Sequence, residues 1–196
     1  MRYSAVLVAG VAGLASQASA QNFSLALVPS ATTVNEGGTF TLSVYGDADA
    51  GSHLLGGAFS LESNSACIVD MSWQNASWSA FNTDGGYAGN GNYNQVIFGQ
   101  LVIPGIFPPA AGSELGGLIG SFSVTVSTGG DGPLFFQLIA GSPFTLETVD
   151  SVSGTTYQSS SGAISLGSAT VFACIPSPGT LAILGLGGLA SARRRR

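Results

Sequence analysis

The sequence has almost no positive charge outside its two ends. Its 196 residues contain no lysine, and its five arginines are Arg2 and the run 193–196. All ten acidic residues lie between these ends, where His53 is the only basic side chain. Nucleic-acid binding needs Lys and Arg to neutralise phosphates, so this composition excludes a nucleic-acid partner. A nucleotide site that relies on Lys or Arg is disfavoured for the same reason.

The N-terminus also lacks an apolar run of about 20 residues, the length that a transmembrane helix needs. Arg2 is instead followed by a short apolar run at 5–14 and by the small residues 18–20. This order of positive, apolar and small residues is typical of a secretory signal peptide. We therefore predict that residues 1–20 are a signal helix, that cleavage precedes Gln21, and that the protein is exported.

The C-terminal segment 174–196 contains a second short apolar run, at residues 179–192. The chain then ends in four arginines: Arg193, Arg194, Arg195 and Arg196. Positive charge resists translocation, so these arginines predict a short hydrophobic helix that stops with its end in the cytoplasm. Long arginine side chains can also extend the effective span.

This tail resembles the PEP-CTERM sorting domain. The proline-containing tripeptide of that domain corresponds to Pro176, Ser177 and Pro178, and Ser177 stands where the family usually has glutamate. The resemblance implies an exported protein that is held transiently in the inner membrane of a Gram-negative bacterium and processed by an exosortase. It implies nothing about the rest of the chain, and the alternative is a plain anchor that is never cut.

Residues 21–173 predict one all-β domain with about nine short strands. The expected strands are 23–28, 39–45, 53–61, 67–71, 96–103, 118–126, 133–139, 144–149 and 163–171. Clusters of Gly, Asn, Asp and Pro separate them, and no segment has a helical period over three turns. Regularly spaced strands of this kind predict an antiparallel β-sandwich. The pair Gly56-Gly57 predicts a bulge or a close backbone approach.

The order of motifs in this domain resembles the cohesin-like family of immunoglobulin-like β-sandwiches. TVNEGGTFTLSVY at 33–45 precedes LLGGAFSLE at 54–62, and GGLIGSFSVTV follows at 116–126. The resemblance implies binding or scaffolding and no catalysis. Cohesins bind dockerin modules, but no residue of this sequence identifies that partner.

The segment 73–95 combines aromatic rings with asparagines and is the best candidate for a glycan-binding surface. The candidate residues are Trp73, Trp78, Tyr87 and Tyr93. Planar rings stack on the faces of sugars, and neutral glycans need no Lys or Arg. The alternative is a long surface loop whose rings fold back onto the edge of the sandwich.

Cys67 and Cys174 are the only cysteines. In an exported protein such a pair suggests a disulfide, although free or partner-linked thiols are alternatives. Asp47, Asp49 and Asp84 are candidate calcium ligands, but their spacing is not that of an EF-hand, and a solvated turn is the favoured interpretation.

No other metal, cofactor or catalytic residue is indicated. His53 has no partner at metal-binding spacing and no nucleophile motif, and a pair of glycosidase carboxylates is recognised only by its separation in space. We therefore expect a non-enzymatic structural or adhesive protein of the cell envelope or the exopolysaccharide matrix, sorted through its tail. Its expected partners are an exosortase, the inner membrane and exopolysaccharide. A carbohydrate-binding module for neutral glycan or exopolysaccharide is the second hypothesis, and a secreted glycoside hydrolase is the third.

Overall fold

The computed structural model describes residues 21–63, 65–129 and 132–174. The predicted signal helix and the sorting tail, from Pro176 to Arg196, lie outside these residues and stay predictions. The helical structure within the described part is the 3₁₀ turn η1 (Ser159–Ser161). The described residues contain no helix with the length and apolarity that a membrane span requires.

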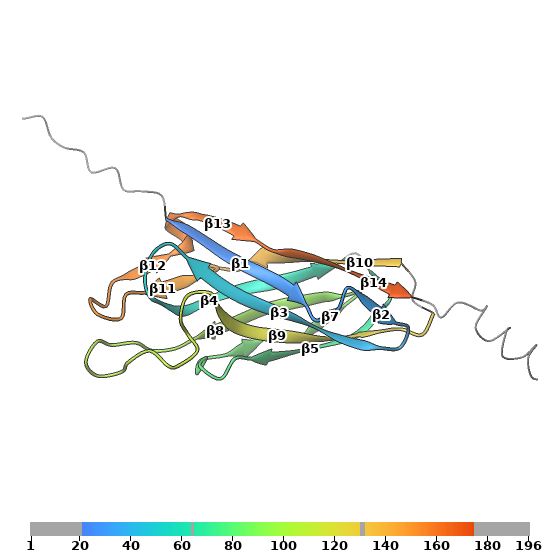
Figure 1. Ribbon diagram of the computed structural model, residues 1–196, viewed down its shortest axis with the longest axis horizontal. Helices are drawn as coiled ribbons and strands as arrows, with labels where there is room; N and C mark the ends of the chain where they lie inside the picture. The colour runs from blue at the N-terminus through green and yellow to red at the C-terminus, as the bar shows by residue number, and fades with distance from the viewer. Residues whose placement is uncertain (1–20, 64, 130–131, 175–196) are drawn as a thin grey trace, which may run out of the picture.

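The described residues form fourteen strands in two sheets that pack face to face (Figure 1). The order in the first sheet is β13 (Ala163–Leu166), β1 (Asn22–Pro29), β3 (Thr39–Ala48), β9 (Gly117–Val126) and β5 (Ile68–Asn75). The order in the second is β12 (Thr156–Gln158), β11 (Glu147–Val149), β4 (His53–Ser63), β10 (Gly132–Ala140), β14 (Ser168–Cys174) and β2 (Thr33–Asn35). The second sheet also contains β8 (Asn92–Gly99), paired with β4, and β6 (Thr83–Asp84) and β7 (Tyr87–Gly89), paired with β8. The predicted all-β sandwich is confirmed.

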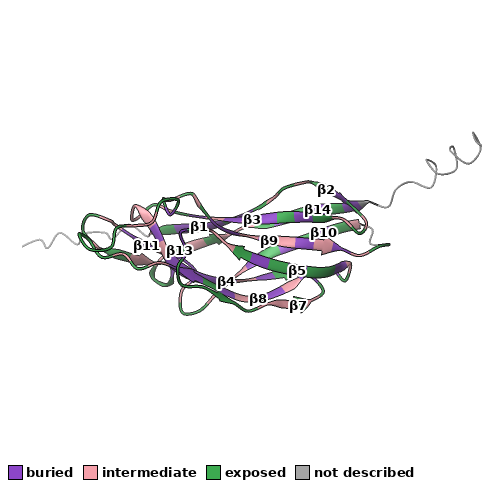
Figure 2. Ribbon diagram, turned by 90° about the horizontal axis from the view of Figure 1, so that it is seen from below, coloured by how far each residue is buried: buried purple, intermediate pink, exposed green. Residues whose placement is uncertain are grey.

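Alternating side chains of the strands fill the space between the two sheets. Figure 2 colours the buried positions along the strands purple. Phe40, Leu42 and Val44 point inward from β3 and are at most 4% exposed. The Phe40 ring meets the Phe136 ring of β10 edge to face across the core, with centroids 5.9 Å apart. Burial of such aromatic and aliphatic side chains is the main stabilising term of a domain of this size. The core extends from Phe23 to Ala173, so a fragment of residues 21–174 contains all of it.

Near each end of the domain, the chain crosses from one sheet to the other. The chain runs from β1 in the first sheet into β2 in the second, and β13 and β14 make the same change around Gly167. The two crossing segments lie side by side, so β1 pairs with β13 and β2 pairs with β14 in parallel. The predicted antiparallel sandwich therefore also contains two parallel pairs, which the sequence analysis did not anticipate.

Gly167 joins the two sheets through its own peptide groups. Its N–H donates to the carbonyl of Leu25 at 2.7 Å in the first sheet, and its carbonyl accepts from the N–H of Leu138 at 3.0 Å in the second. A Cβ on Gly167 would lie 2.6 Å from the backbone N of Leu27, closer than real Cβ atoms approach. The crossing therefore requires glycine.

Gly167→Ala is expected to lower the free energy of unfolding by about 1–3 kcal/mol, because its Cβ forces the two crossing segments apart. Urea denaturation of the fragment 21–174 measures this change. Ser165→Ala, at an exposed position of the same segment, is the control and should leave the free energy of unfolding within about 0.5 kcal/mol of the parent. A Gly167→Ala variant as stable as this control would contradict the role of the crossing.

Candidate functional site

An apolar groove of about 320 Å³ lies over the strand pair β4–β8. Its floor contains Gly56, Gly57 and Ala58 of β4 and Gly99 of β8. The side chains at these four positions are small or absent, and the larger side chains of the lining stand around them. A concave apolar surface of this kind is a typical binding site.

One wall of the groove is the chain segment that follows β10. Gly141 N–H donates to the carbonyl of Ala58 at 3.0 Å, and the carbonyl of Thr145 accepts from Ala58 N–H at 3.2 Å. This double attachment holds Pro143 and Phe144 beside β4, where they line the groove. A Cβ on Gly57 would lie 2.1 Å from the carbonyl oxygen of Thr145, so this approach requires glycine.

The predicted irregularity at the glycine pair is also present. The register between β4 and β11 shifts by one residue between Leu54 and Gly56, next to the groove floor. Of the two alternatives for Gly56-Gly57, the close backbone approach is therefore present, and a register irregularity lies beside it at Leu55.

The opposite wall carries three exposed apolar side chains. Phe81 is 60% exposed, Leu101 51% and Ile97 42%. The Phe81 backbone is anchored to the end of β8, because the carbonyl of Gly99 accepts from its N–H at 2.9 Å. Ser79 strengthens this anchor by accepting from Gly99 N–H at 2.9 Å through its hydroxyl. The sequence analysis missed this wall because nothing in the pattern places residue 81 over β8.

The groove has little capacity for acid–base chemistry. Among its lining residues, Glu147 alone carries an ionisable side chain, and its Oε1 accepts from Gln158 Nε2 at 3.0 Å. Glycoside hydrolysis usually needs two carboxyl groups that flank the scissile bond. The arrangement is suited to receiving an apolar group, and the polar side chains of its lining are Gln100, Ser142 and Glu147.

The structure places the predicted glycan-binding rings inside the sandwich. Trp73, Trp78 and Tyr93 are 9%, 3% and 3% exposed, so they cannot form the proposed stacking surface. Trp73 belongs to β5 and packs against Phe122, with ring centroids 4.6 Å apart. The Trp78 indole donates to the carbonyl of Leu118 at 2.6 Å.

Tyr87 and Tyr93 cover the free edge of β5 at the side of the first sheet. Tyr87 is half-buried and donates its hydroxyl to the carbonyl of Ile68 at 2.5 Å. The Tyr93 hydroxyl accepts from the backbone N–H of Trp73 at 3.1 Å and donates to Asp84 Oδ1 at 2.7 Å. Burial, followed by the hydrogen bond to Asp84, raises the pKa of Tyr93. The aromatic segment thus closes an edge that would otherwise expose unpaired backbone groups.

Tyr93→Phe is expected to lower the free energy of unfolding at pH 7 by about 1–3 kcal/mol, because the buried N–H of Trp73 loses its acceptor. Urea denaturation measures this loss, with the half-buried Tyr45→Phe as the control.

The raised pKa of Tyr93 means that, as the pH rises through about 10, the unfolded chain loses the hydroxyl proton of Tyr93 before the folded chain does. The stabilisation by Tyr93 is therefore full below pH 10 and declines above it. A difference between parent and variant that is unchanged from pH 8 to pH 11 would contradict this assignment.

The three candidate calcium ligands each accept a hydrogen bond from another group of the protein. Asp49 accepts from the backbone N–H of Asn22 at 2.8 Å and from its side chain at 2.7 Å, and these bonds lower the pKa of Asp49. Asp47 accepts from the N–H of Ala48, and Asp84 from Tyr93. In residues 21–63, 65–129 and 132–174, no three His, Cys, Asp or Glu side chains gather as metal ligands.

Cys67 is half-buried and forms no disulfide among the described side chains. The side chain of Cys174 lies outside the described part of the structure, so the disulfide stays a prediction. His53 lies at the start of β4, with its Nδ1 2.9 Å from the hydroxyl of Ser52.

No protein-family model matches the chain, and no curated protein matches it by sequence. Solved structures do match. The seventh ScaB type I cohesin from Pseudobacteroides cellulosolvens is 12% identical, with a TM-score of 0.52 over 81% of this chain and 96% of that one. The OlpA cohesin from Clostridium thermocellum, solved in a type I cohesin–dockerin complex, is 10% identical, with a TM-score of 0.50 over 77% of this chain and 99% of that one. The chain therefore has the cohesin-like β-sandwich fold.

Proposed function

We propose that the protein is an exported, non-catalytic binding module that holds a protein partner in the groove over β4–β8. The groove itself carries the proposal, because it combines a glycine floor with exposed Phe81, Ile97 and Leu101 and contains a single ionisable residue. Exposed apolar side chains around a hollow commonly mark a protein contact. The cohesin-like fold supports this proposal, since the OlpA cohesin was solved with a dockerin bound.

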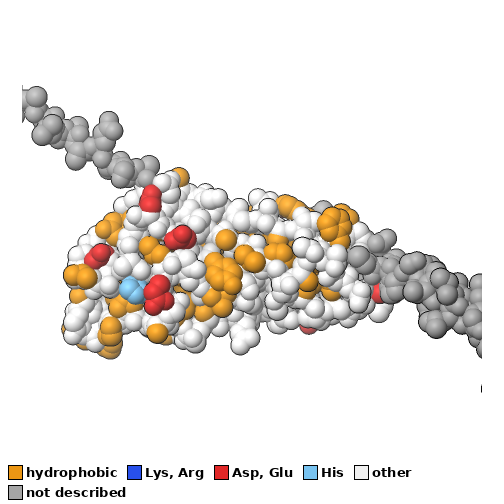
Figure 3. Space-filling view, in the orientation of Figure 1, with side chains coloured by type: hydrophobic (Ala, Val, Ile, Leu, Met, Phe, Trp, Pro, Cys, Tyr) orange, Lys and Arg blue, Asp and Glu red, His pale blue; other side chains and the backbone are white. Residues whose placement is uncertain are grey.

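The composition of the module defines the chemistry of the partner. A groove of about 320 Å³ is at the small end of binding pockets, so it accepts a few apolar side chains of a larger surface. Residues 21–174 contain all ten acidic residues and no Lys or Arg, and Figure 3 shows single acidic side chains among apolar ones on one face. We therefore propose a partner that presents an aliphatic or aromatic anchor flanked by basic residues.

A photo-reactive amino acid at Ile97 is expected to cross-link one defined protein in the cells that produce the chain, because Ile97 lines the groove. The additional substitution Leu101→Asp should abolish the product by placing an unpaired carboxylate in the apolar site. Mass spectrometry of the product identifies the partner and its contact peptide.

The matched control places the photo-reactive residue at Val28, which is 47% exposed and belongs to β1 of the other sheet. The proposal fails if Val28 gives the same product, or if the product survives Leu101→Asp. It also fails if the contact peptide has no apolar anchor.

The proposal also includes the cellular location of the module. The signal-like residues 1–20 support export, and the resemblance of 174–196 to a PEP-CTERM tail supports transient anchoring in the inner membrane and processing by an exosortase. The destination that we propose is the cell envelope or the exopolysaccharide matrix, where the module has a structural or adhesive role.

Replacing Arg193, Arg194, Arg195 and Arg196 by serine is expected to remove the positive charge that holds the tail at the membrane. The full chain should then leave the inner-membrane fraction and keep its unprocessed C-terminus. Cell fractionation, with mass spectrometry of the C-terminal peptide, measures both effects. Replacing the same four residues by lysine is the control, because it keeps the charge and should keep the membrane intermediate. Equal fractionation of the serine and lysine variants would contradict the proposed tail.

A further inference from the structure

Two loops at one end of the long axis of the sandwich expose apolar side chains to solvent. They are the β8–β9 connection and the β11–β12 connection, which both reach the left end of the molecule in Figure 1. The loops meet, since a Cβ on Gly154 would lie 3.0 Å from Cγ of Pro104. We define the apolar tip as Ile103, Pro104, Ile106, Phe107 and Val152. Val152 is 88% exposed, Ile106 67% and Phe107 50%.

The backbone of the apolar tip is largely satisfied by its own hydrogen bonds. Ile103 and Phe107 exchange two bonds, of 2.9 Å from Ile103 N–H and 2.8 Å from Phe107 N–H, and Ile106 N–H donates to the carbonyl of Ile103 at 3.0 Å. Prolines at 104, 108 and 109 have no N–H to satisfy. Transfer of a loop from water to an apolar medium costs free energy mainly where a polar group loses its hydrogen bonds. The internal hydrogen bonds and the prolines of this loop lower that cost.

The side chains of the same loop offer nothing for specific polar recognition. Residues 101–112 read LVIPGIFPPAAG and contain no side chain that can donate or accept a hydrogen bond. Protein–protein interfaces typically carry about ten hydrogen bonds, and the side chains of residues 101–112 contribute none. A lipid bilayer needs none, and its flat surface can meet a convex molecular end more readily than a groove on the flank.

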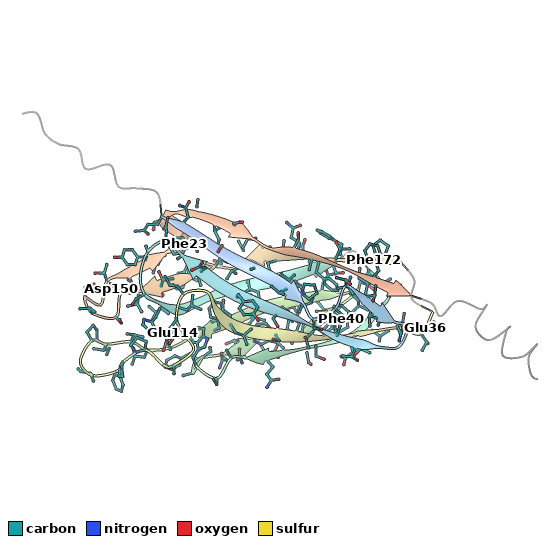
Figure 4. The ribbon with its side chains drawn as sticks, viewed as in Figure 1. Phe23, Glu36, Phe40, Glu114, Asp150 and Phe172 are labelled. Atoms are coloured by element: carbon teal, nitrogen blue, oxygen red, sulfur yellow. The ribbon has the colours of Figure 1, made fainter. Side chains whose placement is uncertain are left out.

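We propose that the apolar tip inserts into the interfacial region of a lipid bilayer. Ile106 and Phe107 are the principal inserting side chains, and Val152 provides a second point of contact from the neighbouring loop. Glu114 and Asp150 lie at the same end of the molecule (Figure 4), and residues 21–174 contain no Lys or Arg. The proposed surface is therefore zwitterionic, because anionic lipid repels these carboxylates. This site is separate from the groove and goes beyond the proposed function.

Flotation of the fragment 21–174 with phosphatidylcholine vesicles tests the proposal without the two terminal segments. The parent fragment should float, and the partition coefficient should fall roughly tenfold or more in the double variant Ile106→Ser/Phe107→Ser, which loses two exposed apolar side chains. Vesicles that contain one part phosphatidylglycerol to two parts phosphatidylcholine should bind the parent more weakly.

Two controls separate the tip from general stickiness and from the groove. Val28→Ser/Val69→Ser removes apolar side chains that are 47% and 54% exposed elsewhere on the sandwich and should float like the parent. Ile97→Asp alters the groove and should also float like the parent. Loss of flotation in this groove variant would assign lipid binding to the proposed partner site instead of the tip.

Phe107→Trp supplies a second readout that does not depend on loss of binding. Its emission should shift to shorter wavelength with vesicles and lose quenching by aqueous acrylamide, while Trp73 and Trp78 are already buried. The proposal is overturned if the cooperatively folded parent does not float, if the double variant floats equally well, or if the new tryptophan stays exposed to quencher. If the parent binds no vesicles but binds a protein that Ile106→Ser/Phe107→Ser fails to bind, the proposal is also overturned and the tip is assigned to a protein partner.

Discussion

The two sheets depend on one shared structural feature, the side-by-side crossing of the first and last strands. Through Gly167, Leu25 in one sheet and Leu138 in the other are joined by consecutive backbone hydrogen bonds. The crossing closes one side of the sandwich with backbone pairing, and it connects the N- and C-terminal parts of the chain. Because the paired segments are far apart in sequence, their contact forms only when the whole domain is in place. The groove is connected to this crossing, since β10 pairs with both β14 and β4.

The opposite side of the sandwich is closed by side chains. Tyr87 and Tyr93 bond the exposed edge of β5, and Trp73 and Trp78 fill the space beneath them. This use of the aromatic segment explains why the glycan hypothesis did not hold for these rings. Part of the signal was present in the sequence, because Met71 and Trp73 alternate with exposed Ser72. The register shift between Ile68 and Asp70 puts this alternation out of step with Ile68. The alternation does not reveal that Tyr87 of β7 and Tyr93 of β8 lie against the edge of β5. Their position depends on contacts between strands that are not adjacent in sequence.

The fold was predictable where one physical rule dominates. Period-two alternation placed Phe40, Leu42 and Val44 on one face, and the glycine pair at 56–57 indicated the close approach that the structure contains. The parallel pairs were not predictable, because strand direction is decided by topology and leaves no local pattern. The groove was missed for a related reason. Gly99, Phe81 and Pro143 look like ordinary loop residues in sequence, and their common position arises only from the backbone bonds at Gly99 and Ala58.

The shortage of positive charge affects both how the carboxylates of this molecule are stabilised and what its surface can bind. With no Lys or Arg between residues 21 and 174, the carboxylates must be satisfied by neutral donors, as Asp49 is by Asn22 and Asp150 by Ser153. The same shortage removes cationic recognition from the surface, so attachment must rely on apolar contact and on positive charge that a partner supplies. Apolar surface that is not paired carries a risk of aggregation. In this molecule the exposed apolar surface is concentrated in the groove and at the apolar tip, where hydrogen bonds already fix the backbone. This placement favours a role in binding over a defect in packing.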